Sequence, residues 1–183
     1  MFAEHRQRNE QGWLIYPRDV SLRRSVGFVE ESFDHPAKAN LHLVQDLIEH
    51  LSQRGDRVMD ITAGTGAVLL ACKLERKAVA IDINSEYIQW MRRSAEQMKL
   101  NPADYTILEG DCRDYLPLEC KAIIFSPPYS QVMSSTGGIM SRDKVMIEQY
   151  SRYQQDRTNP KNLGNLPEFR FNYAMKTVYQ KCL

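Results

Sequence analysis

Hydrophobic residues follow two different patterns between residues 41 and 126, and each pattern predicts a different element. Over 41–51, leucine, valine and isoleucine recur at three- and four-residue intervals, which predicts one face of a helix that stops before Gly55. A second pattern of this kind, "SEYIQWMRRSAEQMKL", predicts a helix that Asn84 or Ser85 caps. The short unbroken apolar runs between and after these helices are typical of buried strands.

Four such runs predict four strands. They lie near 57–61, at "KAVAIDIN", which ends its strand at Asp82, at "DYTILEGD" and at "KAIIFS". Because strands and helices alternate at these lengths, we expect an α/β fold with a mostly parallel sheet and helices on both faces. The pattern supplies about four strands, and the chain ends within a helical pattern that no glycine, asparagine or proline closes.

The organisation we expect divides the chain into four parts. Residues 1–34 lack a sustained period and predict an extended arm, and residues 35–129 form the α/β core. Residues 130–168, rich in Ser, Gly and Asn, predict a long loop around one helix, and loops of this length are usually functional or mobile. Residues 169–183 begin the next core helix.

Composition narrows the class of protein without choosing a function. With 183 residues, 43% hydrophobic and 26% charged, the chain is expected to be one globular domain. A net charge of +1 neither requires nor excludes nucleic acid as a partner. The four cysteines are scattered without a CxxC pair, so we expect no metal site and reduced thiols. Without a secretory or membrane-spanning apolar run, we expect a cytoplasmic protein that has no contact with membranes.

Each predicted strand ends in residues that suit a ligand site, because ligands of open α/β sheets bind at the carboxyl ends of strands. The turn "DITAGTG" places two glycines where the backbone can approach a ligand, but it lacks the spacing of phosphate-binding loops. Asp60 in this turn favours a cationic ligand. Asp82 is placed to accept hydrogen bonds from a ribose, and Asp111 from an exocyclic amine. The alternatives are a structural turn for the glycines, a helix cap for Asp82 and a solvated turn aspartate for Asp111.

The fourth strand ends in "SPPY", and this motif together with "DITAGTG" resembles the exocyclic amino methyltransferases of DNA, the N4-cytosine and N6-adenine class. Upstream, "FDHPAKANLHLVQDLI" is similar to the segment that precedes the glycine motif in this family. The resemblance implies a Rossmann-like fold and S-adenosylmethionine as the cofactor. It implies these cofactor-binding residues: His35, Lys38, Asp60, Thr62, Ala63, Gly64, Gly66, Asp82, Ile83, Asp111 and Cys112, with Pro36 and Asn40 beside them. His35 as a capping or packing residue remains an alternative.

The resemblance places catalysis at Ser126, Pro127, Pro128 and Tyr129. The lone pair of a base amine is delocalised into the ring, so acceptors that bind its hydrogens make the nitrogen more nucleophilic. The Ser126 side chain and the Pro127 carbonyl are such acceptors, on a backbone that tandem prolines make rigid. Tyr129 offers a face for a base flipped out of the duplex. Serine at the first position favours N4-cytosine over N6-adenine.

Double-stranded DNA is therefore the expected partner, in a prokaryotic or phage setting such as restriction-modification. We expect basic residues of the 130–168 insert to contact it, namely Arg142, Lys144, Arg152 and Arg157. An RNA base methyltransferase of the guanine-N2 type and an inactive cofactor-binding fragment are the alternatives. Compared with the seven-stranded sheet of the family, the chain looks C-terminally truncated. A second chain that supplies the missing half of the sheet is one explanation, and weak activity of the isolated chain is expected.

Overall fold

Four parallel strands form the sheet on which the rest of the chain packs. The computed structural model describes residues 2–35, 38–128 and 159–183. The strands pair in the order β3-β2-β1-β4, and they are β1 (Arg57–Asp60), β2 (Lys77–Asp82), β3 (Tyr105–Glu109) and β4 (Ala122–Ile123). This order, with parallel pairing throughout, matches the first four strands of a doubly wound Rossmann sheet. The predicted α/β, Rossmann-like fold is confirmed.

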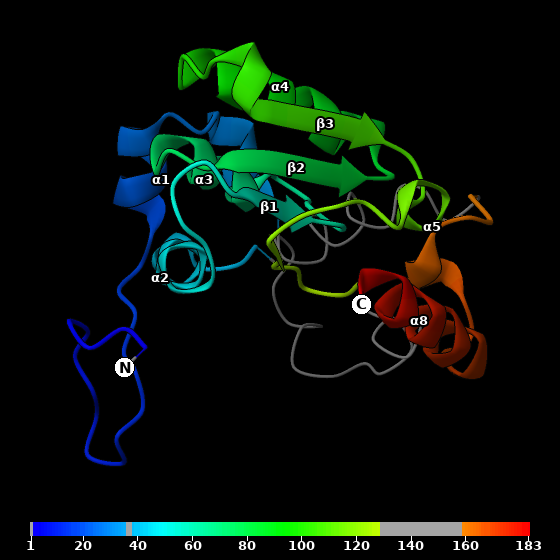
Figure 1. Cartoon of the computed structure of the whole chain (residues 1–183), viewed down its shortest axis with the longest axis horizontal. Coiled ribbons are helices and arrows are strands. Elements are labelled where there is room, and N and C mark those ends of the chain that lie inside the picture. The colour runs from blue at the N-terminus through cyan, green and yellow to red at the C-terminus, as the bar shows by residue number, and fades with distance from the viewer. Residues whose placement is uncertain (1, 36–37, 129–158) are drawn as a thin grey trace.

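Helices connect the strands and cover them (Figure 1). The α-helices are α1 (Val20–Val26), α2 (Leu41–Leu51), α3 (Leu70–Lys73), α4 (Ser85–Gln97), α5 (Cys112–Tyr115) and α8 (Glu168–Cys182). Short 3-10 turns are η1 (Glu30–Asp34), η2 (Ala67–Leu69), η3 (Pro102–Asp104) and η5 (Leu163–Asn165). The helices predicted near 41–51, 85–100 and 169–183 are confirmed, whereas the helix predicted inside the 130–168 insert lies outside the described residues.

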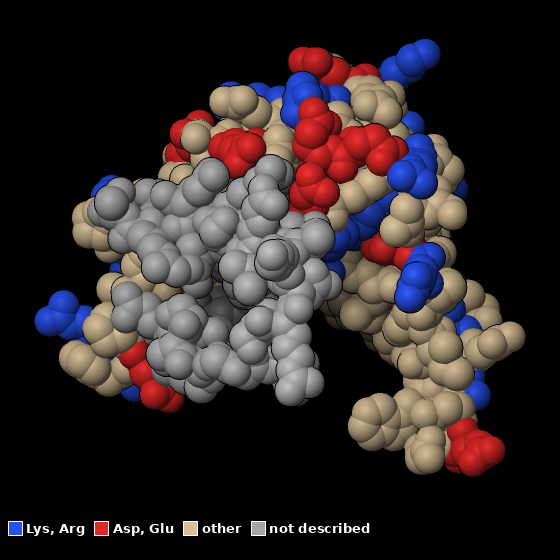
Figure 2. Space-filling view, turned by 180° about the vertical axis from the view of Figure 1, so that it is seen from behind, with Lys and Arg blue, Asp and Glu red and all other residues tan. Residues whose placement is uncertain are grey.

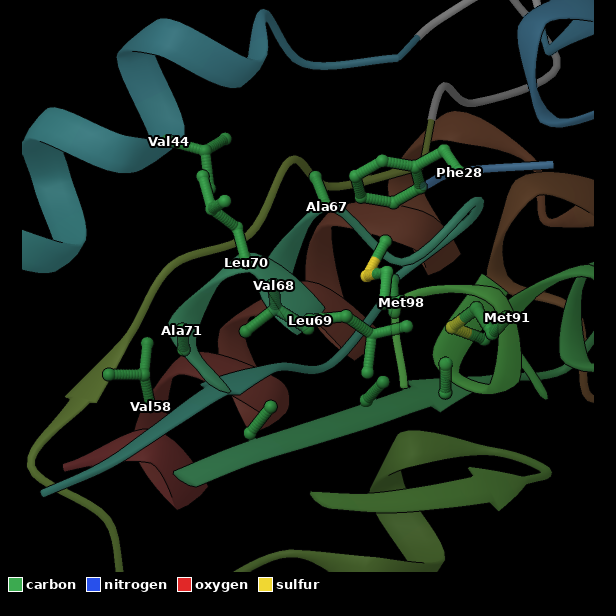
Figure 3. Packing of buried hydrophobic residues seen from close by; sticks show 14 of the residues in the cluster. Phe28, Val44, Val58, Ala67, Val68, Leu69, Leu70, Ala71, Met91 and Met98 are labelled. Carbon is green, nitrogen blue, oxygen red and sulfur yellow. The ribbon is translucent and has the colours of Figure 1, made fainter. Parts of the chain in front are cut away.

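The two faces of the sheet pack against different helices. Val58 of β1, with Ala78 and Ala80 of β2, belongs to a core cluster that also contains residues of α2, α3 and α4 (Figure 3). The residues between them along the strands, such as Met59 and Val79, point to the opposite face and pack in a second cluster with α5 and α8. Strands buried on both faces read as unbroken apolar runs, which explains why they were predictable from sequence.

Side-chain caps set the beginnings of α2 and α4. The Asn40 side chain accepts hydrogen bonds from the backbone N–H groups of His42 and Leu43 at 2.9 and 3.4 Å, which starts α2. The Asn84 side chain accepts from the Glu86 N–H at 2.9 Å, so Asn84 rather than Ser85 caps α4. These caps satisfy backbone donors that have no partner within the helix.

The first 34 residues contain more structure than an extended arm. Arg6 donates two hydrogen bonds of 2.9 Å to the Asp46 carboxylate on α2, which anchors the first residues to the core. α1 follows, with Arg23 completely buried, and Phe28 packs in the main core cluster. α1 was not predicted from the sequence, because an arginine occupies its buried position and interrupts the helical spacing of apolar residues.

Gly66 is the position where the fold tolerates a side chain least. Its φ of +80° is left-handed, and an added Cβ would lie 2.6 Å from Cγ of the buried Met91. Gly55 has a φ of +85° but open space around it, so it is a matched control.

We therefore predict that Gly66→Ala lowers the free energy of unfolding by about 2–5 kcal/mol, from backbone strain plus overpacking. Gly55→Ala is expected to cost only the backbone part, about 1–2 kcal/mol. Urea denaturation of both variants measures the difference. Equal losses in the two variants would show that contact with Met91 does not constrain the turn.

Candidate functional site

Local hydrogen bonds stabilise the glycine turn between β1 and η2. The Thr62 N–H donates to Oδ1 of Asp60 at 3.0 Å, and the Gly66 N–H donates to the Ala63 carbonyl at 2.8 Å. The Ala63 N–H donates to the Ile81 carbonyl of β2 at 2.9 Å, which fixes the turn to the neighbouring strand. Gly64, with a φ of +51°, and Gly66 both have left-handed backbones, which glycine adopts at low cost.

Asp82 joins this turn to the end of β2. Its Oδ2 atom accepts a hydrogen bond of 2.6 Å from the Gly64 N–H, and its Oδ1 accepts one of 2.9 Å from the Asn84 N–H. The carboxylate thus has a structural role, but it is not the helix cap given as the alternative, because Asn84 caps α4. The Ile83 N–H also interacts with this carboxylate, which has about four acceptor positions in all, so the structural role and ribose binding are compatible. Ile83 lies half-buried directly after it.

The electrostatics of the turn favour a cationic ligand. Burial raises the pKa of Asp60 to about 7, and the neighbouring Asp82 carboxylate adds to this effect. Burial also raises the pKa of Asp82. Within the described part of the chain, neither carboxylate forms an ion pair with a lysine or arginine side chain. Two carboxylates without a basic partner suit a ligand that has positive charge and no phosphate, as S-adenosylmethionine does.

His35 borders the same turn from the other side. It is buried, its ring lies 4.8 Å from that of Tyr87, and a Cβ added at Gly64 would lie 3.2 Å from its Nε2 atom. Burial, followed by the charges of Lys38 and Arg23, lowers the pKa of His35 to about 4, so the ring is neutral near pH 7. His35 therefore packs against Tyr87 and borders the turn, and its contact with the cofactor stays a prediction.

Lys38 lies beside His35 and is held by backbone carbonyls. Its ammonium group donates to the carbonyls of Phe33 and His35 at 2.7 and 2.8 Å. Burial, and then the charge of Arg23, lowers the pKa of Lys38. Asn40, which the resemblance also placed near the cofactor, caps α2, while Pro36 lies outside the described residues.

The end of β3 differs from the expected adenine contact. The Asp111 side chain caps α5 by accepting from the Arg113 N–H at 2.9 Å, and the Arg113 guanidinium binds both of its carboxylate oxygens. Asp111 is buried, so it is not the solvated turn residue given as the alternative, and its contact with a ligand stays a prediction. Next to it, Cys112 is buried, and burial raises the pKa of its thiol to about 12.

The proline corner after β4 lies against the glycine turn. The Thr62 hydroxyl donates a hydrogen bond of 2.8 Å to the Ser126 carbonyl, which joins two segments 64 residues apart in the chain. Ser126 is exposed and Pro127 and Pro128 are half-buried. Sequence reasoning listed Thr62 as a cofactor residue and missed this contact, because no local pattern reports a hydrogen bond across two strand ends.

Several predicted residues lie outside the described part of the chain. They are Tyr129, Arg142, Lys144, Arg152 and Arg157. Among residues 2–35, 38–128 and 159–183, no group of His, Cys, Asp and Glu side chains is arranged to hold a metal ion. None of the helices described there has the length and apolar character needed to cross a bilayer.

Comparisons with solved structures give partial matches. TrmN from Thermus thermophilus is 20% identical with a TM-score of 0.48, over 79% of this chain and 39% of that chain. A SAM-dependent methyltransferase from Agrobacterium tumefaciens is 18% identical with a TM-score of 0.44, over 50% of this chain and 33% of that chain.

Sequence comparisons are more specific. The Type II methyltransferase M.BglI from Bacillus subtilis is 38% identical over 69 residues, which are 37% of this chain. The match spans only 20% of that relative's length. A family model described as DNA methylase, of the N6/N4 type, matches residues 4–93, a segment that includes the glycine turn, Asp82 and α4. Residues 4–93 of the chain are thus similar to the N6/N4 DNA methylase family.

Proposed function

We propose that this chain contains the cofactor site and the catalytic corner of a DNA amino-methyltransferase. The observation that carries the proposal is the hydrogen bond of 2.8 Å between Thr62 and Ser126. It fixes the turn suited to a cationic cofactor directly beside the Ser-Pro-Pro segment. A methyl group and its acceptor must approach closely and in line, and alignment of this kind lowers the barrier of a transfer reaction.

S-adenosylmethionine is the cofactor that similarity to this family implies, and the residues around the turn fit it. Asp82 would bind the ribose through its free acceptor positions, while Asp60 would lie near positive charge on the ligand. Gly64 and Gly66 let the backbone approach the ligand. When bound, S-adenosylmethionine supplies an electrophilic methyl group on a positively charged sulfur.

At the corner, the chain's own groups hold the target amine. The Ser126 side chain and the Pro127 carbonyl accept its hydrogens, which draws the nitrogen lone pair out of the ring and towards the methyl group. The exposure of Ser126 supports this role, because an incoming base can reach it. Tyr129 stacks on the extruded base. The serine at position 126 favours the N4 amine of cytosine over the N6 amine of adenine.

The substrate we propose is double-stranded DNA. On the face shown in Figure 2, the described residues mix acidic and basic side chains, so this face is not a broad basic surface for phosphates. We therefore assign the phosphate contacts to the basic residues of the 130–168 insert, Arg142, Lys144, Arg152 and Arg157, and expect them to act mainly on affinity.

A second polypeptide completes the DNA site in this proposal. Within the described sheet, β4 pairs only with β1, which leaves one edge open. Beside it lies a groove of about 430 Å³, lined by Pro127 and by one face of α8 that includes Phe171, Met175 and Tyr179. An open strand edge next to an apolar groove suits an added strand.

The direct test is methylation of double-stranded DNA and of RNA with labelled S-adenosylmethionine, followed by analysis of the modified nucleosides. We expect N4-methylcytosine from DNA, with weak turnover by the isolated chain. Label in N2-methylguanosine from RNA would favour the alternative function. No label in either substrate, combined with intact cofactor binding, would favour an inactive fragment.

We predict that S-adenosylmethionine affinity rises about tenfold between pH 6 and pH 8, as Asp60, with its pKa near 7, becomes ionised. Asp60→Asn should remove most of this dependence, whereas Glu109→Gln, at the exposed end of β3, should keep it. Calorimetric titration at several pH values gives the affinities. A pH profile that is unchanged in Asp60→Asn would contradict the assignment.

The same carboxyl group makes the ligand-free chain less stable as pH rises. A carboxyl group whose pKa is raised on folding holds its proton in the folded state between pH 4 and 7, so unfolding becomes easier as pH increases through this window. Urea denaturation at pH 5 and pH 7 should show this loss, and Asp60→Asn should show a smaller one. A loss of the same size in the variant would place the titrating group elsewhere.

We also predict that Ser126→Ala lowers methyl transfer roughly 100-fold, the scale for loss of one positioned hydrogen-bonding group. Its affinity for S-adenosylmethionine should stay within about twofold, because its carbonyl still accepts from Thr62. Labelled turnover and calorimetry separate the two effects. If Ser126→Ala and Asp60→Asn weakened cofactor binding equally, the division between corner and turn would be wrong.

A further inference from the structure

Arg23 of α1 is a fully buried arginine whose position needs a functional explanation. Its Nε donates to Oδ2 of Asp19 at 2.8 Å and its Nη2 to the Ala39 carbonyl at 2.5 Å. Its Nη1 is buried and has no hydrogen-bond partner among the residues that the structure describes. Burying a guanidinium costs free energy, and an unpaired donor adds to that cost. An apolar residue at this position would usually serve stability as well or better.

The contacts of Arg23 hold the stretch of chain that begins at Lys38. Asp19, its ion-pair partner, also accepts a hydrogen bond of 2.8 Å from the Leu41 N–H at the start of α2. Ala39, which lies between Lys38 and Leu41 in the chain, accepts a hydrogen bond from the Arg23 guanidinium through its carbonyl. Lys38 is therefore anchored on its C-terminal side through Arg23, and its ammonium group binds the His35 carbonyl.

Positively charged groups and carboxyl groups lie on different sides of the glycine turn. On one side lie the cations Arg23 and Lys38, with neutral His35 in contact with Gly64. Asp19 and Asp34 are the acidic groups that act on this side. On the other side lie the carboxyl groups of Asp60 and Asp82. The amino-acid end of S-adenosylmethionine carries a carboxylate and an ammonium group, so its charges match these two sides.

We propose that Arg23 is a positioning residue that fixes Lys38 and His35, and adds positive charge, on the side of the turn where the cofactor carboxylate binds. The inference rests on the proposed function. Arg23 does not touch the ligand in this account, because its side chain is fully buried. It acts through Ala39 and through its charge.

Two ligands that differ in the amino-acid portion separate this role from general support of the fold. S-adenosylhomocysteine carries the carboxylate, and 5′-methylthioadenosine lacks the whole amino-acid end. We expect Arg23→Met to lower the affinity for S-adenosylhomocysteine about tenfold and the affinity for 5′-methylthioadenosine less than twofold. Calorimetric titrations of the 183-residue chain measure both affinities. Arg93→Met is the matched control, because it removes an exposed ion pair with Glu31 of 2.8 Å and should change neither affinity.

A conservative variant keeps the test decisive if Arg23→Met does not fold. Arg23→Lys retains the charge, so we expect its S-adenosylhomocysteine affinity within about threefold of wild type. The inference would be overturned by a tenfold loss of S-adenosylhomocysteine affinity in Arg23→Lys. It would also be overturned if Arg23→Met lowered the affinities for both ligands equally. If the wild-type chain binds neither ligand, the proposed function fails instead. If wild type binds and Arg23→Met binds equally well, the inference about Arg23 fails alone.

Discussion

The Asp82 carboxylate is the constraint on which the geometry of the site depends. Through bonds of 2.6 and 2.9 Å it holds the Gly64 N–H of one strand end and the Asn84 N–H at the start of α4. Both are backbone donors at the carboxyl edge of a parallel sheet, where no neighbouring strand remains to accept them. An internal carboxylate in this place shapes the glycine turn, which in turn positions Thr62 against Ser126. The turn, the helix cap and the proline corner are thus parts of one hydrogen-bonded unit.

This unit creates an electrostatic asymmetry. Asp60 and Asp82 lie at the ends of adjacent strands, and burial raises the pKa of both. Opposite them, burial and nearby positive charge keep His35 neutral, with Lys38 and Arg23 behind it. A cofactor with separated positive and negative groups gains from both sides, whereas a pyrophosphate would meet two carboxylates. The absence of a phosphate-binding spacing in "DITAGTG" agrees with this arrangement.

Much of the fold could be predicted from sequence because its elements have local signals. The strands that end at Asp60 and Asp82 are apolar runs followed by turn residues, and α2 and α4 begin at asparagine caps. α1 could not be predicted, since Arg23 occupies its buried position. β4 is also shorter than its apolar run suggests, with only Ala122 and Ile123 in the ladder.

The candidate site was predictable only in part. The residues at the strand ends were found because parallel strands bring their carboxyl ends to one edge. The pairing of Asp111 with Arg113 was not predicted, although an arginine two residues after a capping aspartate is a usable signal. The hydrogen bond between Thr62 and Ser126 depends on the strand order, which no local pattern contains.

The measurement that tests the central claim most directly is a calorimetric titration of the chain with S-adenosylhomocysteine at pH 8. We predict saturable binding of one ligand per chain, and loss of this binding when Asp60 is replaced by asparagine and Gly64 by valine together. Absence of any binding to the folded wild-type chain would contradict the assignment of this edge of the sheet as the methyl-donor site.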